Sequence, residues 1–161
     1  MQESVQSHRA HLGRTAMGVL LSLLGESVGG ESAGSDMEVA ERVLDVLASL
    51  VTVEEGEGVG ELEVARWNCK RVVEKSEAVE ALLTLLVGGE VGVRLLAAQV
   101  LAALVEGSGK GLRSVVLRVP EGPVRLADAL RERDADVRAE VLVVVGGLAR
   151  ESAEIRSALA F

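Results

Sequence analysis

Apolar residues recur at intervals of three and four along most of the chain, which is the period of an amphipathic α-helix. The segment 76–87 is the clearest case, with apolar side chains at Val79, Leu82, Leu83 and Leu86. Ser76 stands where a helix N-cap is expected, and the pair Gly88 and Gly89 ends the pattern. The spacing therefore predicts a helix between Ser76 and Val87.

The same pattern and its punctuation predict helices throughout the sequence. They cover residues 13–24, 36–52, 61–75, 76–87, 90–106, 109–119, 123–131, 135–150 and 153–161. Pro123 suits the first turn of its helix. The Gly-, Ser- and Glu-rich stretches 25–35 and 53–60 are predicted to be surface loops. Val141 to Val145 favours a strand by local propensity, but the aligned segment 97–101 is a good helix former, so we expect a helix there too.

Segments of the chain resemble one another at a period in the low forties. Leu82, Val93-Arg94 and Leu104 match Leu126, Val137-Arg138 and Leu148 at a shift of 44 residues. Units of this length with two or three helices are typical of armadillo and HEAT repeats. We therefore expect one all-α domain over 1–161, an armadillo-like solenoid (an α-α superhelix) of three to four repeats. Its best-defined repeats are 76–119 and 120–161, preceded by the acidic N-terminal repeats in 1–60.

Composition limits the core and the partners. Trp67 and Phe161 are the only aromatic residues, so the core must consist of Leu, Val and Ala. The net charge is -8, and residues 1–60 hold ten acidic side chains against three Arg. A chain of this charge repels a phosphate backbone, so no nucleic-acid partner is expected. The longest apolar run, 95–105, is shorter than the ~20 residues that span a bilayer, which predicts no transmembrane segment.

Few side chains are candidates for chemistry. Gly107 to Gly111 superficially resembles a phosphate-binding loop, but it lacks the required spacing and the Ser or Thr after Lys110, so a turn between helices is favoured. His8 and His11 lack a third ligand for a metal. Asp134 and Asp136 fit a helix cap better than an acid–base pair. Cys69 is predicted to be a buried small side chain.

No catalytic, cofactor-binding or metal-binding residue is therefore predicted, and no cofactor. We expect a protein that is not an enzyme and that binds other proteins through residues the sequence leaves unknown.

From Pro120 to Phe161 the sequence resembles the armadillo-like globular head of the general vesicular transport factor family, golgin-type tethers of ER-to-Golgi traffic. The shared residue types include Gly122, Arg125, Leu126, Asp128, Leu130, Arg150 and Ile155. Gly13, Ala16, Met17, Leu20 and Leu24 fit a family helix, and Glu54-Glu55 begin a typical acidic insert. Leu95 departs from the pattern, where the family has tryptophan.

The resemblance implies a non-catalytic scaffold for vesicle tethering in ER-to-Golgi and intra-Golgi transport. The implied partners are a Rab-type GTPase, SNARE proteins, a Golgi tethering complex and, in the full-length form, a second copy of the protein. The implied location is cytoplasmic, peripheral on Golgi and transport-vesicle membranes. A generic armadillo adaptor, such as a nuclear-transport or chaperone-regulating module, is the alternative; the single Trp67-Asn68 pair argues against the cargo-import type.

The final predicted helix places Ile155, Leu159 and Phe161 near the end of the sequence. The family's repeats continue beyond this point, so we expect a fragment or a truncated gene model. In a solenoid, each repeat buries its apolar face against its neighbours. An exposed apolar patch is accordingly expected at the C-terminal end.

Overall fold

The structure, a computed structural model, describes residues 2–29, 33–150 and 152–160 of the chain. This part consists of α-helices joined by short connections and contains no strand. The helices are α1 (Gln2–Thr15), α2 (Met17–Gly29), α3 (Ala33–Val51), α4 (Val59–Val73), α5 (Ser76–Gly88), α6 (Val91–Arg118), α7 (Gly122–Ala129), α8 (Ala135–Arg150) and α9 (Ala153–Leu159). The prediction of an all-helical chain is confirmed for the described residues, including the helical state of Val141 to Val145.

Two predicted boundaries are wrong near the N-terminus. The predicted helix 13–24 is divided between α1 and α2, and α2 continues to Gly29. The predicted loop 25–35 is therefore helical at 25–29 and again at 33–35, whereas 30–32 lie outside the described residues. Val28 packs against the hydrophobic core, which favours continuation of the helix through a stretch rich in Gly and Ser. The predicted loop 53–60 is correct for 53–58, after which α4 begins.

Helix α6 joins two predicted helices, 90–106 and 109–119. It is kinked at Ser108, whose backbone angles (φ -155°, ψ 46°) are not helical. By length and composition alone α6 is long and apolar enough to cross a membrane, with 28 residues and a mean hydropathy of 1.5 over its most apolar window. In the structure it packs against α3, α4, α5, α7 and α8. The absence of a transmembrane segment remains a prediction.

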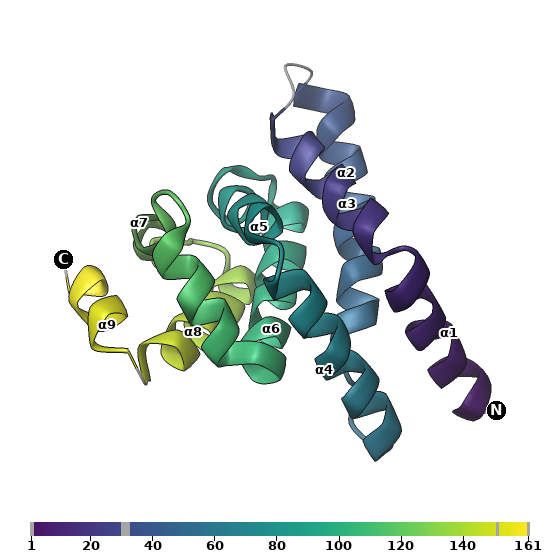
Figure 1. The fold of residues 1–161 in the computed structure, drawn as a ribbon. Helices are drawn as coiled ribbons and strands as arrows, with labels where there is room; N and C mark the ends of the chain where they lie inside the picture. The colour runs from purple at the N-terminus through teal and green to yellow at the C-terminus, as the bar shows by residue number, and fades with distance from the viewer. Residues whose placement is uncertain (1, 30–32, 151, 161) are drawn as a thin grey trace.

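The helices follow one another across the molecule in three groups, α1 to α3, α4 to α6 and α7 to α9 (Figure 1). Helices of successive groups contact each other. Helix α2 contacts α5, and α5 contacts α7. Helix α3 contacts α6, which contacts α8, while α1 contacts α4. Contacts between distant parts of the sequence therefore connect each group to the next.

The core is a continuous cluster of Leu, Val and Ala side chains, joined by Met17, Cys69 and Ile155. Most positions that the 44-residue shift aligns are buried in both segments: Leu82 with Leu126, Val93 with Val137, and Leu104 with Leu148. Leu86 and Leu130, which the same shift aligns, differ in burial, because Leu86 is buried whereas Leu130 is 37% exposed. Burial of a Leu or Val side chain contributes roughly 1.5–3 kcal/mol, so these matched positions account for much of the stability of both segments.

Of the three side chains expected to form an apolar patch at the C-terminal end, the structure describes Ile155 and Leu159. Ile155 is completely buried, and Leu159 is partly buried against the core. Helix α9 folds back onto α7 and α8, which cover its apolar side. Phe161 lies outside the described residues.

An arginine near the start of α6 and another near the start of α8 each bind the turn that precedes their helix. Arg94 on α6 donates to the carbonyl oxygen of Gly89 (2.8 Å), and Arg138 on α8 donates to that of Arg133 (3.3 Å). Both acceptors lie five residues before the arginine. Arg94 also forms an ion pair with Glu132 (Nε to Oε2, 2.7 Å), whose side chain is 9% exposed. This pair ties the start of α6 to the connection between α7 and α8.

We predict that Glu132→Gln destabilises the protein in a pH-dependent manner. The hydrogen bond from Arg94 is the main cause of the lowered pKa of Glu132. A carboxylate with a lowered folded-state pKa contributes stability that is complete above its unfolded pKa, about 4.3, and is lost as the pH falls through the folded-state value. Glutamine keeps an acceptor for the backbone N–H groups of Arg133 and Asp134 but has no charge. The free energy of unfolding should fall by about 1–3 kcal/mol at pH 7.

Denaturant unfolding at pH 7 and at about pH 3 measures this effect, and the gap to the wild type should narrow at the lower pH. Asp128→Asn is the control, because Asp128 is 46% exposed and pairs with Arg131 at 3.7 Å. This control should change stability by less than about 1 kcal/mol. A gap for Glu132→Gln that is the same at both pH values would contradict the assignment.

Candidate functional site

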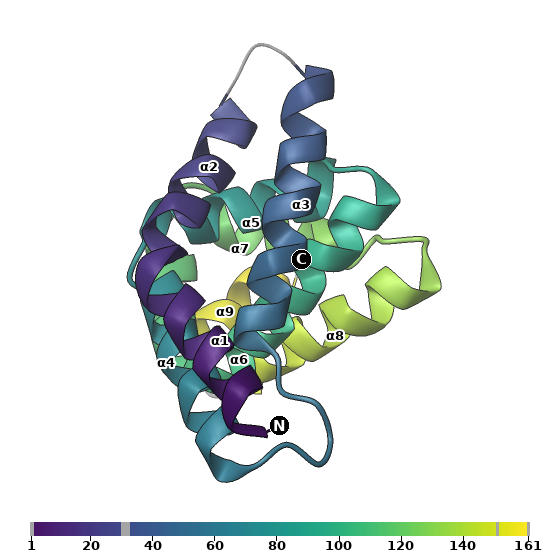
Figure 2. The ribbon, with the colours of Figure 1, turned by 90° about the vertical axis from the view of Figure 1, so that its right-hand side faces the viewer.

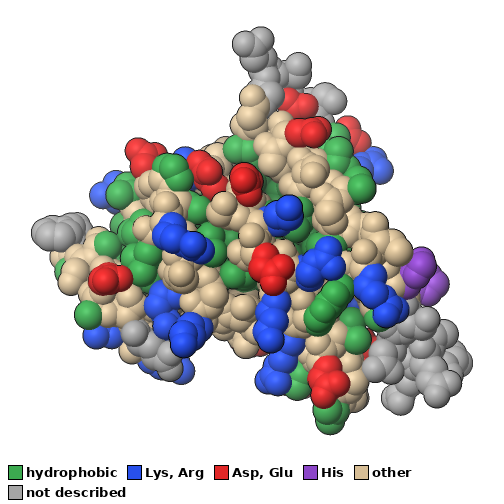
Figure 3. Space-filling view, in the orientation of Figure 1, with side chains coloured by type: hydrophobic (Ala, Val, Ile, Leu, Met, Phe, Trp, Pro, Cys, Tyr) green, Lys and Arg blue, Asp and Glu red, His purple; other side chains and the backbone are tan. Residues whose placement is uncertain are grey.

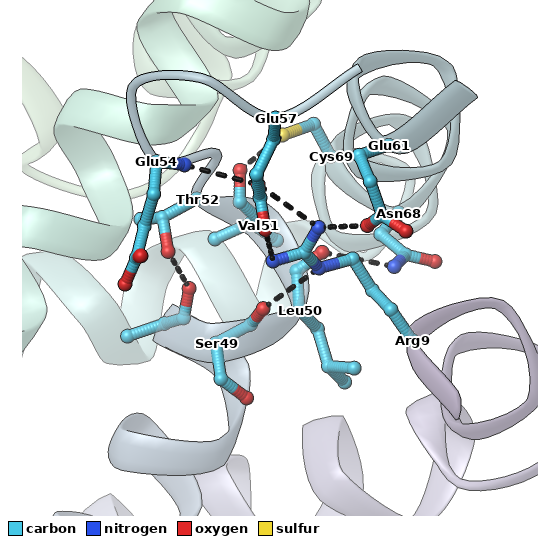
Figure 4. A network of polar contacts seen from close by, with 11 residues as sticks. Arg9, Ser49, Leu50, Val51, Thr52, Glu54, Glu57, Glu61, Asn68 and Cys69 are labelled. Carbon is cyan, nitrogen blue, oxygen red and sulfur yellow. Dashed lines mark hydrogen bonds and ion pairs between the residues drawn. The ribbon is translucent and has the colours of Figure 1, made fainter. Parts of the chain in front are cut away.

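Helix α3 ends inside the molecule, so the carbonyl groups of its last turn need partners from elsewhere. The backbone N–H of Thr52 donates to the carbonyl oxygen of Ala48 (3.0 Å). The next three carbonyl oxygens accept from side chains, as Figure 4 shows: Ser49 from Arg9 (3.1 Å), Leu50 from Asn68 (2.9 Å) and Val51 from Cys69 (3.8 Å). Side chains from α1 and α4 therefore fix the end of α3.

Arg9 is the centre of this polar cluster. Its guanidinium forms two hydrogen bonds to Glu57 (3.2 and 3.3 Å) and also contacts Glu61. The side chains of Arg9 and Glu61 are only 12% and 11% exposed. Desolvation raises the pKa of Glu57, but the hydrogen bonds from Arg9 and from the backbone N–H of Glu54, together with the charge of Arg9, outweigh it and lower the pKa. Arg9 thus connects α1 to the 53–58 loop and to α4.

Asn68 lies at the contact between α1 and α4. It is completely buried, and its Oδ1 faces Gly13, where a Cβ atom would overlap the amide group. Glycine is therefore needed at position 13 for this close approach of the two helices. The Asn68 amide nitrogen donates to the carbonyl oxygen of Leu50, while its Oδ1 has no hydrogen-bond partner in the described structure.

A groove of about 660 Å³ lies beside this cluster. Its longest wall is a stripe along α6 from Leu96 to Gly107, which is about 16 Å at 1.5 Å per residue. Residues of α3 and α8 also line the groove; both helices contact α6, and in Figure 2 α3 lies in front of it. Helix α4 contributes the residues next to Gly107. The lining is mostly apolar and includes Leu62, Ala65, Leu96, Ala102, Ala103 and Val143.

Three carboxylates on three different helices line the groove. They are Asp45 on α3, Glu106 on α6 and Glu140 on α8, against one basic residue, Arg66 on α4. In the described part of the chain none of these four side chains has a hydrogen bond or ion pair, unlike Glu57, Glu61 and Glu132. The groove therefore combines apolar side chains with three carboxylates that form no ion pair in the described structure.

The face shown in Figure 3 differs in charge. Lys and Arg side chains gather there over α4 and the second half of α6. Trp67 is 40% exposed on α4, and the Arg71 guanidinium lies 5.0 Å from the centre of its ring. At that distance the pair is a cation–π contact.

The structure separates the candidate residues of the sequence. His8 and His11 are exposed on α1, and no group of three His, Cys, Asp or Glu residues suited to a metal occurs in the described part of the chain. Gly107 to Gly111 lies at the kink of α6, where the sequence predicted a turn between two helices. Cys69 is fully buried, as predicted, and burial is the main cause of a pKa raised to about 12, with the charge of Glu106 also raising it. Its thiol is therefore protonated at neutral pH and is a poor nucleophile.

The helix caps are partly as predicted. Asp134 Oδ1 accepts from the backbone N–H groups of Asp136 and Val137 (both 3.1 Å), which confirms Asp134 as a cap of α8. Ser76 is the first residue of α5 rather than its N-cap, which is Lys75. Ser152 caps α9 by accepting from Ile155 (3.2 Å), and this cap was not predicted.

Arg9 and Asn68 were not predicted from the sequence either. A signal for Asn68 was present, because it lies between Ala65, Cys69 and Val72 at the spacing of buried positions. A polar residue at such a position indicates a buried hydrogen bond. Arg9 gave no comparable signal, because its partners lie 40 to 52 residues away in the sequence.

In comparisons with known proteins, no protein-family model and no curated protein matches the chain.

We predict that Arg9→Met lowers the free energy of unfolding by about 3 kcal/mol or more, because it leaves the buried carboxylate of Glu61 without its partner. Arg14→Met is the matched control on the same helix; Arg14 is exposed, and its removal should cost less than about 1 kcal/mol. Denaturant unfolding of both variants measures the difference. Equal stability of the two variants would show that the Arg9 cluster does not hold α1 in place.

We predict that Gly107→Ala separates α4 from α6. A Cβ at this position would lie 2.6 Å from the Cys69 sulfur and 2.9 Å from its Cβ, and rotation of the thiol cannot relieve the second contact. Overpacking of this kind costs about 1–3 kcal/mol. Gly109→Ala is the control, since no atom of a neighbouring element lies within 4 Å of the Cβ that it would add. It should be neutral or stabilising by up to about 1 kcal/mol, measured by thermal or denaturant unfolding.

Proposed function

We propose that this chain is a non-catalytic protein-binding scaffold with the fold of an armadillo-like solenoid of three to four repeats. Three features support the repeat arrangement. Helices of successive groups contact each other, most positions aligned by the 44-residue shift are buried in both segments, and Arg94 and Arg138 make the same bond to a preceding turn. Repeats stacked in this way create extended surfaces that suit protein partners.

The groove along α6 is the single observation that carries the binding function. It crosses α3, α6 and α8, one helix from each of the three groups, and so it exists only because the groups are stacked. Its apolar lining stays open to solvent, with Val143 48% and Leu62 38% exposed. A groove that combines apolar side chains with charged ones has the composition of surfaces that bind protein partners.

Within this class, the resemblance to the general vesicular transport factor family favours a vesicle tether of ER-to-Golgi and intra-Golgi transport. The proposed partners are accordingly a Rab-type GTPase, SNARE proteins, a Golgi tethering complex and, in the full-length form, a second copy of the protein. The proposed location is the cytoplasmic surface of Golgi and transport-vesicle membranes. A generic armadillo adaptor is the alternative, and it requires the same groove but different partners.

The test is direct binding to synthetic peptide arrays that cover the cytosolic parts of Golgi SNAREs, Rab-type GTPases and Golgi tethers. We expect discrete peptides to bind the chain, and Val143→Arg to weaken their binding by about tenfold, equivalent to 1.4 kcal/mol, because it places a charge and a long side chain in the groove. Val124→Arg is the matched control: Val124 is 58% exposed on α7, outside the groove.

Three outcomes separate the possibilities. Binding that Val143→Arg weakens and Val124→Arg does not supports the scaffold and the tether. Binding of peptides from other adaptor clients alone, tested on a second array, supports the generic adaptor instead. If neither array yields a peptide sensitive to Val143→Arg, the groove is not a binding site and the proposed scaffold function is wrong.

A further inference from the structure

We infer that the groove along α6 binds an amphipathic α-helix of a partner protein, with an apolar stripe of Leu-type side chains flanked by Lys and Arg. The inference rests on the proposed function, because it names the kind of partner that the same groove takes. Three properties of the groove support it: its shape, the state of its backbone groups and its charge.

The shape of the groove fits the side of a helix. The lining positions on α6 are Leu96, Gln99, Ala102, Ala103 and Glu106, which recur at three and four residues and so form one straight stripe. The small side chains of Ala102 and Ala103 leave the space over the middle of the stripe, between α3 and α8. A length of about 16 Å corresponds to three turns of a partner helix, or apolar side chains at positions i, i+3 or i+4, and i+7.

The backbone of the groove offers no partners to an extended peptide. All lining residues except Thr52 and Val53 belong to helices, which bond most of their N–H and C=O groups internally, and the last carbonyl groups of α3 accept from Arg9, Asn68 and Cys69. The hydroxyl groups of Ser49 and Thr52 donate to carbonyl oxygens of their own helix. An extended peptide would have to leave backbone groups unpaired against the apolar lining, which costs free energy for each of them. A helix pairs its own backbone groups and avoids this cost.

The charge of the groove selects a basic helix. Asp45, Glu106 and Glu140 line the groove from three different helices, and Arg66 is the only basic residue among the lining residues. None of these carboxylates has an ion-pair partner in the described structure. Lys and Arg beside the apolar stripe of a bound helix would meet unpaired carboxylates, whereas Asp and Glu at the same positions would be repelled.

The experiment uses three fluorescein-labelled helical peptides of about 18 residues, or five turns. The first has a Leu stripe flanked by Lys, the second the same stripe flanked by Glu, and the third the Lys residues with the Leu residues replaced by Ser. Fluorescence anisotropy with the whole 161-residue chain should give binding of the first peptide only. Its affinity should fall as the salt concentration rises.

A pair of double variants places the binding in the groove. Asp45→Lys with Glu140→Lys should weaken the Leu–Lys peptide by about tenfold and strengthen the Leu–Glu peptide. Glu63→Lys with Glu77→Lys is the control with the same change in net charge, because both residues are exposed and neither lines the groove. It should change the affinity by less than about twofold. Circular dichroism checks that both double variants keep the helical fold.

Failure of this inference is distinct from failure of the proposed function. If the Leu–Glu peptide binds as well as the Leu–Lys peptide, or if both double variants weaken binding equally, the inferred chemistry is wrong. The same holds if no designed helix binds while array peptides still bind in a manner sensitive to Val143→Arg; in that case the scaffold function stands. Loss of both kinds of binding overturns the scaffold function together with this inference.

Discussion

Packing of one long helix against helices from every part of the chain is the constraint on which this structure depends. Helix α6 contacts α3 on one side, α8 on the other, and α4, α5 and α7 besides. Because the described core holds no aromatic residue, these contacts are made by many Leu, Val and Ala side chains of similar size. Each contributes modestly, and their sum holds the three groups of helices together. The kink at Ser108 lets the two halves of α6 follow different neighbours, since a straight helix of 28 residues would extend about 42 Å in one direction.

The same packing explains how a groove arises beside a well-packed core. Helices α3, α6 and α8, one from each group, bury one face against the core and leave part of the other face open. The end of α3 lies at the edge of the groove, and its carbonyl groups would be unpaired there without Arg9, Asn68 and Cys69. Because those side chains come from α1 and α4, the shape of the groove at the end of α3 depends on residues outside α3, α6 and α8.

Apolar periodicity, together with the signals at helix ends, predicted most of the helices. Residues 76–87 and 135–150 were placed almost as the structure has them, because their apolar spacing is regular and their ends have clear signals. The stretch 25–29 was mistaken for a loop, since Gly and Ser favour turns locally but Val28 gains more by packing in the core. The groove was not predicted. Its lining comes from four helices far apart in the sequence, and its carboxylates on α3, α6 and α8 have no common motif. Only the stacking of the helices brings Asp45, Glu106 and Glu140 to one cavity.

The position of Trp67 determines what optical methods can report about this protein. It is the only tryptophan, and the chain has no tyrosine. Its ring lies on the outer face of α4, 40% exposed and against Arg71, rather than in the core or among the lining residues of the groove. Intrinsic fluorescence is therefore a local probe of α4 and its basic face. It is nearly blind to side-chain packing around α6, so backbone circular dichroism is the better signal for following the whole fold.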